Sequence, residues 1–133
     1  MKWVVVIPLL ALALGARAQA PSGDEASDAQ SRVVEAIVEC LAAGLPQDWQ
    51  RAVMDVNLGK PLDETGTARY MVVRGERSEV TEPFVPCDSA KPVRILIEAR
   101  QLQLEERRGW IDARLFVLRD GRFGIRYGYP PKQ

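Results

Sequence analysis

The sequence predicts an α+β fold: a mainly antiparallel sheet of four to five strands with two helices packed on one face. Three observations support this prediction. Two segments carry an apolar stripe at helical spacing, several others are strand-like with apolar and polar residues alternating at period two, and short turns join consecutive strands. Strands joined by short turns pair antiparallel. The predicted order is helix, two strands, a marginal third strand, helix and two strands.

The first 20 of the 133 residues precede this domain. Lys2 is followed by an apolar run, residues 3–14, and then by small residues ending in Ala18 and Ala20. This pattern is typical of a secretory signal peptide, cleaved near Ala18 or Ala20, and the run is shorter than the about 20 residues that a membrane span requires. An uncleaved N-terminal anchor is the alternative. We therefore expect a periplasmic protein without a stable membrane anchor.

Residues 21–28 are small and polar and predict a flexible leader, so that a single domain spans residues 29–133. Without the first 20 residues the chain has 16 basic and 18 acidic residues, a net charge of −2. This balance supplies no attraction to nucleic acid, and no basic run predicts attachment to a membrane surface.

The first helix is expected to start at a cap, Ser27 or Asp28, and to run to about Ala43. Gly44 and Pro46 then end it. Its apolar residues form one stripe at helical spacing: Val33, Val34, Ile37, Val38, Leu41 and Leu45.

Three strand-like segments follow. Residues 51–58 alternate with period two, and residues 67–74 are rich in tyrosine and valine. Residues 79–85 form a marginal third strand, and Pro83 would confine it to a sheet edge. A second helix is predicted over residues 90–106, with Asp88 or Ser89 as its cap and Pro92 in its first turn. One of its faces carries Val93, Leu96, Ile97, Arg100 and Leu104.

The C-terminal segment predicts a β-hairpin. Residues 110–118 and 122–129 both alternate, and Asp120-Gly121 lies between them, where glycine tolerates the positive φ of a tight turn. One face of the hairpin is apolar and is expected to pack on the helices. The other face carries Asp112, Arg114, Arg122 and Arg126.

Two cysteines, Cys40 and Cys87, are an even pair in a chain predicted to be exported, so a disulfide is expected. It would join the far end of the first helix to the start of the second. The chain has no histidine, which excludes Ser-His-Asp and Cys-His catalytic arrangements and histidine-based zinc sites. Neighbouring carboxylates, Asp63-Glu64 and Glu105-Glu106, lie in charged segments typical of solvated surface. We therefore expect no catalytic site, metal or cofactor.

The remaining candidate site is the polar face of the C-terminal hairpin. Arg114, Arg122 and Arg126 are expected to lie close together on neighbouring strands, with Phe116 beside them as an apolar anchor. Arginine and aromatic residues are enriched in protein interfaces, which makes this face a candidate surface for a protein partner. An ordinary solvated sheet face, with Asp112 balancing part of the charge, is the alternative.

Two patches resemble the YezG-like immunity proteins, also known as domain of unknown function 600. One is Leu45-Pro46-Gln47-Asp48-Trp49 before a strand, and the other runs from the strand opened by Trp110 through Asp120-Gly121 to a strand closing in Tyr129. The resemblance implies a small α+β protein that binds and neutralises a toxin. The chain departs from the family in its signal peptide, its cysteine pair, its near-neutral charge, and Arg126 and Gly128 where acidic residues are common.

We accordingly expect a periplasmic immunity or inhibitor protein, not an enzyme, that occludes a toxin or effector acting in the cell envelope. The alternative is a small-ligand-binding or envelope accessory domain of cystatin-like or nuclear-transport-factor-like type. A deep apolar pocket between helices and sheet would favour the ligand-binding alternative. A filled core beneath an exposed sheet face would favour the immunity protein.

Overall fold

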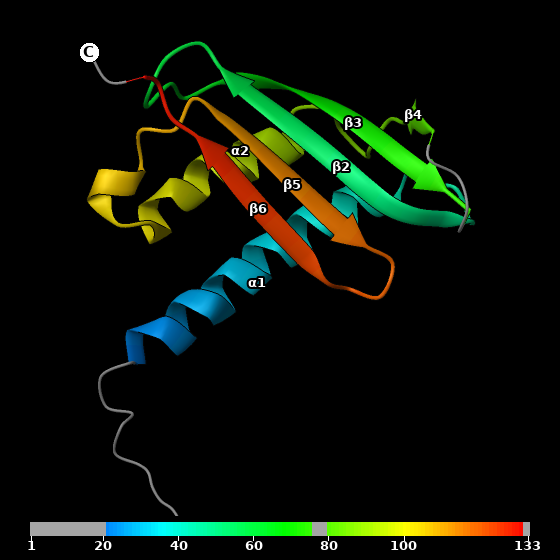
Figure 1. Cartoon of the computed structure of the whole chain (residues 1–133), viewed down its shortest axis with the longest axis horizontal. Helices are drawn as coiled ribbons and strands as arrows, with labels where there is room; N and C mark the ends of the chain where they lie inside the picture. Colours follow the sequence, from blue (N-terminus) through cyan, green and yellow to red (C-terminus); the bar gives the residue numbers. More distant parts are fainter. Residues whose placement is uncertain (1–20, 76–79, 132–133) are drawn as a thin grey trace, which may run out of the picture.

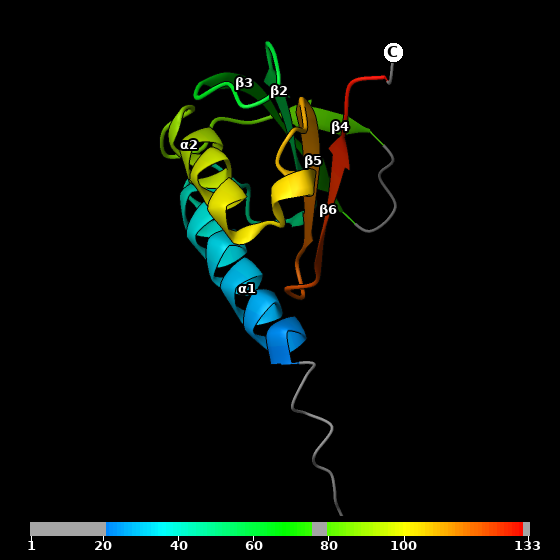
Figure 2. The same ribbon diagram turned by 90° about the vertical axis from the view of Figure 1, so that its left-hand side faces the viewer.

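The computed structural model describes residues 21–75 and 80–131. The predicted signal peptide, residues 1–20, lies outside the described residues. Five strands form one antiparallel sheet in the order β4-β3-β2-β5-β6, and both helices cover the same face of it (Figures 1 and 2). This arrangement confirms the predicted α+β class. The strands are β2 (Trp49–Leu58), β3 (Gly66–Arg74), β4 (Thr81–Pro83), β5 (Asp112–Leu118) and β6 (Phe123–Gly128).

Helix α1 (Pro21–Ala42) begins earlier than predicted. The expected cap at Ser27 or Asp28 is wrong, and the residues predicted as a flexible leader form the first turns of the helix. Proline is compatible with a first turn, where a missing N–H leaves no bond unmade, and no later proline interrupts the segment. No helix among the described residues is long and apolar enough to cross a membrane.

The core lies between the helices and the inner face of the sheet. Its central strand is β2, whose inward residues alternate with exposed or half-exposed ones, as the period-two pattern predicted. The fully buried side chains include Trp110, Ile37, Met54, Leu115 and Leu96. These large groups fill the space between helices and sheet, and at about 25 cal/mol per Å² of apolar area their burial supplies the main favourable term in folding.

The marginal third strand forms as β4, only three residues long, and pairs with the outer side of β3. Pro83 lies opposite Met71 in this pairing. The strand therefore ends one side of the sheet, where a proline removes no ladder bond, as predicted.

The second helix is shorter than predicted. Helix α2 spans Lys91–Glu98 and is followed by two short 3₁₀ segments, η2 (Ala99–Leu102) and η3 (Glu105–Arg107). Leu104, the last apolar residue of the predicted stripe, is 63% exposed, so the continued stripe finds no core to cover. Trp110 is instead the fully buried residue near this segment, and its indole N–H donates to the Gln103 side chain at 3.0 Å. Tertiary packing of one tryptophan thus overrides the local helical pattern.

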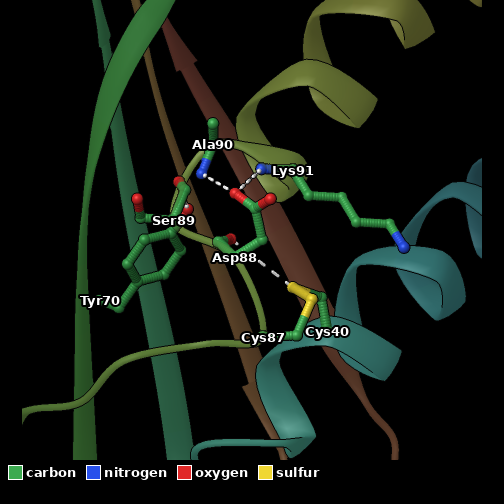
Figure 3. The surroundings of a disulfide bond; sticks show 7 residues. All are labelled: Cys40, Tyr70, Cys87, Asp88, Ser89, Ala90 and Lys91. Carbon is green, nitrogen blue, oxygen red and sulfur yellow. Dashed lines mark hydrogen bonds between the residues drawn. A yellow bond between two sulfur atoms is a disulfide. The ribbon is translucent and has the colours of Figure 1, made fainter.

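The disulfide between Cys40 and Cys87 joins the end of α1 to the segment before α2, as predicted (Figure 3). The Cys87 N–H also donates to the Cys40 carbonyl oxygen at 2.9 Å. Gly44 lets this segment cross closely, because a Cβ there would collide with the Val85 carbonyl oxygen. The Asp88 carboxylate accepts bonds from the N–H groups of Ala90 and Lys91 just before α2. The residue at the N-cap position itself is Ala90, so the predicted cap at Asp88 or Ser89 is wrong by one or two positions.

Candidate functional site

The outer face of the sheet, turned away from the helices, holds the candidate site. Strand register aligns its side chains in two adjacent rows across β3, β2, β5 and β6. We call the first the arginine row; it consists of Arg69, Asp55, Arg114 and Arg126. We call the second the aromatic row; it consists of Met71, Val53, Phe116 and Gly124. Residues from four strands, more than fifty positions apart in the chain, therefore share one surface.

Arg114 is held in place by Asp55. Its guanidinium donates two hydrogen bonds to the two carboxylate oxygens, at 2.6 and 3.0 Å. The hydrogen bond with Asp55 raises the pKa of Arg114, so that this side chain stays charged throughout the accessible pH range. An exposed ion pair contributes less than about 1 kcal/mol to folding, so its main effect is to fix the guanidinium along the sheet.

Arg69 and Arg126 flank this pair at the two ends of the arginine row. Both are exposed, and within residues 21–75 and 80–131 neither makes an ion pair. Arg126 lies directly opposite Arg114 in the β5–β6 register. Like charges in opposed positions destabilise a sheet. An anionic group that reached the row would relieve this repulsion, so the row is electrostatically suited to an acidic partner.

Phe116 lies over Gly124. A Cβ at Gly124 would come within 2.6 Å of the Phe116 ring, so only glycine leaves room for the aromatic ring in this position. The ring is still 39% exposed. Four residues earlier on β5, the Asp112 carboxylate covers Gly128 of β6 in the same manner. The two glycines thus allow β5 side chains to lean over β6 and place an apolar ring beside Arg126.

A hollow of about 670 Å³ lies over the arginine row. Polar and charged side chains line most of it, including Asp55, Asn57, Thr67, Arg69, Arg114 and Arg126. It differs from the deep apolar pocket between helices and sheet that a cystatin-like or nuclear-transport-factor-like ligand site would need. Its composition suits carboxylate-bearing groups better than an apolar ligand.

Arg122 does not join the other candidate residues. It lies at the β5–β6 turn, where its backbone N–H and its guanidinium both bind Asp120, at 3.0 and 2.8 Å. The backbone hydrogen bond from Arg122 is the main cause that lowers the pKa of Asp120. Arg122 and Arg126 are four positions apart along the chain, about 13 Å at the usual rise of a strand. The structure therefore pairs Arg114 with Arg126 beside Phe116, whereas Arg122 lies at the turn end of the same face with its guanidinium bound to Asp120.

Sequence reasoning missed Arg69 and the role of Asp55. Alternation with period two does place Arg69 on the face away from the buried Tyr70 and Val72, and it places Asp55 on the face away from the buried Met54 and Val56. What the sequence lacks is the strand order, which sets β5 beside β2 and so puts Asp55 next to Arg114.

The other polar groups singled out in the sequence lie elsewhere. Glu64, Glu105 and Glu106 are exposed, and Asp63 is partly so. Among the described residues, no group of three or more acidic or cysteine side chains could hold a metal ion. Tyr127 packs against Trp110, with ring centroids 5.4 Å apart, and burial raises the pKa of its hydroxyl. It lies at the rim of the core.

No family model and no curated protein matches the sequence.

Proposed function

We propose that this protein is an exported immunity or inhibitor protein that binds a toxin or effector in the cell envelope and blocks it without catalysis. The observation that carries the proposal is the outer face, where Arg69 and Arg126, which have no ion pair among the described residues, flank Arg114, and the exposed Phe116 lies alongside. Arginine and aromatic side chains of this kind dominate binding energy in protein interfaces. Among the described residues, the large side chains fully buried between helices and sheet favour this function over a ligand carrier.

The proposed location rests on two further observations. A disulfide persists in an oxidising compartment, and Cys40–Cys87 is formed in the fold. The first 20 residues have the composition of a secretory signal peptide. An immunity protein in the periplasm would meet effectors that act there, such as those attacking peptidoglycan or lipid.

The candidate contact residues are Arg114, Phe116 and Arg126, together with Arg69, while Arg122 is a peripheral member at the turn. We expect the partner to present carboxylates to the arginine row. Blocking the toxin's active site requires no catalytic residue on this chain, because a protein bound over that site keeps the substrate out.

A small anionic ligand is the second candidate, because the hollow over the arginine row is polar. Both candidates use the same arginines. They differ in footprint: a protein partner also covers Phe116 and Val53, whereas a small anion in the hollow leaves the aromatic row exposed.

Protection of the producing organism tests the proposal. A strain lacking this gene is grown in competition with its unmodified parent, and is complemented with wild type or with Arg69→Glu/Arg126→Glu. We expect the deletion strain to be killed by its siblings, wild type to protect it, and the charge-reversed variant to fail although it folds. Survival of the deletion strain under conditions in which the parent produces its envelope toxins would contradict the immunity function.

A further inference from the structure

The two edges of the sheet differ. On one side, β4 has three residues and includes Pro83, two features that protect an edge from pairing with another chain. On the other side, β6 has six residues without a proline and ends the sheet. Among the described residues, no strand pairs with the edge of β6 that faces away from β5 (Figure 1).

Backbone N–H and C=O groups along this edge of β6 are consequently available to bond another strand. The Leu118 N–H donates to the Arg122 carbonyl oxygen at 2.8 Å, and the Ile111 N–H donates to that of Gly128. Backbone groups alternate in direction along an antiparallel strand. The even-numbered residues of β6 thus point their N–H and C=O groups at β5. Phe123, Ile125 and Tyr127 point theirs away from it, where an added strand would find them.

The inner side chains of β6 leave apolar surface open as well. Phe123, Ile125 and Tyr127 are only partly buried, whereas the inward residues of β5 are at most 4% exposed. An added strand would bring its own inward side chains against them. Those side chains must therefore be apolar.

The charge of the outer face determines which residues the added strand must present on that face. Arg126 is the one side chain that β6 presents between Gly124 and Gly128, and it has no ion pair within the described chain. An acidic residue of the added strand would lie beside it. Asp112 already covers Gly128, so a neutral or basic residue is favoured there. A second copy of this chain is disfavoured, because edge-to-edge pairing would put two Arg126 side chains on one face.

We propose that the partner binds by adding an extended segment to the free edge of β6, with alternating apolar and polar residues and an acidic residue facing Arg126. This inference rests on the proposed function, since it names how the partner of that surface is held. Backbone hydrogen bonds supply the affinity, and the residues facing Arg126 and Gly128 supply the specificity.

Random linear peptides displayed on phage are the probe. They are selected on the wild-type protein, and an enriched peptide is then bound to wild type, Arg126→Glu and Arg94→Glu. Arg94 is an exposed arginine on α2, across the domain from the outer face, and serves as the matched control. We expect alternating sequences with an acidic residue, and an affinity reduced by about tenfold or more in Arg126→Glu, as for loss of one charged pair. Arg94→Glu should bind as wild type does.

Amide hydrogen exchange measures the edge directly. Saturation with the enriched peptide should slow exchange at Phe123, Ile125 and Tyr127, while Gly124 and Arg126, already bonded to β5, change little. The inference is overturned if no peptide is enriched, or if the bound peptide leaves the three amides unprotected. A natural partner that needs Arg126 but does not protect these amides would refute edge addition and leave the proposed function standing. If the peptide adds to the β6 edge but the wild-type gene does not protect the deletion strain from killing, edge addition would stand and the proposed function would be refuted.

Discussion

Removing the disulfide is expected to destabilise the protein strongly. Cys40 and Cys87 are 47 positions apart, and they join two segments that otherwise meet through one backbone hydrogen bond and the packing of α1 on α2. In the chain-entropy model, closing a loop of this length removes about 14 cal/mol/K from the unfolded ensemble, or about 4 kcal/mol at 25 °C. A domain of this size has a free energy of unfolding of only about 5–15 kcal/mol, so the loss would be a large fraction of it.

The test compares wild type with Cys40→Ala/Cys87→Ala in urea. Alanine is preferred to serine because Cys40 is 2% exposed, and a buried hydroxyl there would add its own desolvation cost. The variant's free energy of unfolding should fall by about 4 kcal/mol, and its m-value should rise because its unfolded chain is more expanded. Wild type in reducing agent should behave as the variant does. A loss below about 1 kcal/mol in both samples would refute the entropic argument.

Three further changes test the packing. Gly124→Ala should push the Phe116 ring off β6 and remove the NOEs between that ring and residue 124. The stability cost should be less than about 1 kcal/mol, because the ring can turn into solvent. Retained NOEs would contradict the close packing. Trp110→Ala should lower the free energy of unfolding by about 3–5 kcal/mol in urea, since the indole is fully buried, and a loss near zero would refute its place in the core. Burial raises the pKa of Tyr70 from 10.0 to about 12. The folded state therefore keeps this proton where the unfolded state loses it, and stability is lost as pH rises from 10 to 12; Tyr70→Phe should lack this component in pH-dependent unfolding, and an identical profile would count against it.

Local chemistry allowed the best predictions from sequence. The β5–β6 turn was predicted because Asp120-Gly121 requires a positive φ at the glycine, and Gly121 has a φ of +99°. The disulfide followed from two cysteines in a chain predicted to be exported, and the edge position of β4 followed from Pro83.

Non-local packing decided what the sequence could not show. The stripe that extended the second helix to Leu104 was a valid helical pattern, but in the fold Leu104 is 63% exposed and Trp110 is fully buried. Likewise, alternation assigned Arg114 and Arg126 to the outer face correctly, whereas Asp55 came beside them only through the pairing of β2 with β5. Arg122 lies on the outer face as the alternation predicts, but at the turn its guanidinium binds Asp120. A face can be predicted from period two, but neighbours on that face require the strand order.

The central claim is that the outer face of the sheet binds a protein partner. Quantitative mass spectrometry of proteins captured from envelope extract tests it most directly, with wild type, Arg69→Glu/Arg126→Glu and the control Arg32→Glu/Arg94→Glu as baits. Arg32 and Arg94 are exposed residues of the helical layer, so the control carries the same change in charge on the opposite side. We predict an exported effector that wild type and the control capture equally and that Arg69→Glu/Arg126→Glu loses. Equal capture of that effector by all three baits, each shown to be folded, would contradict the claim.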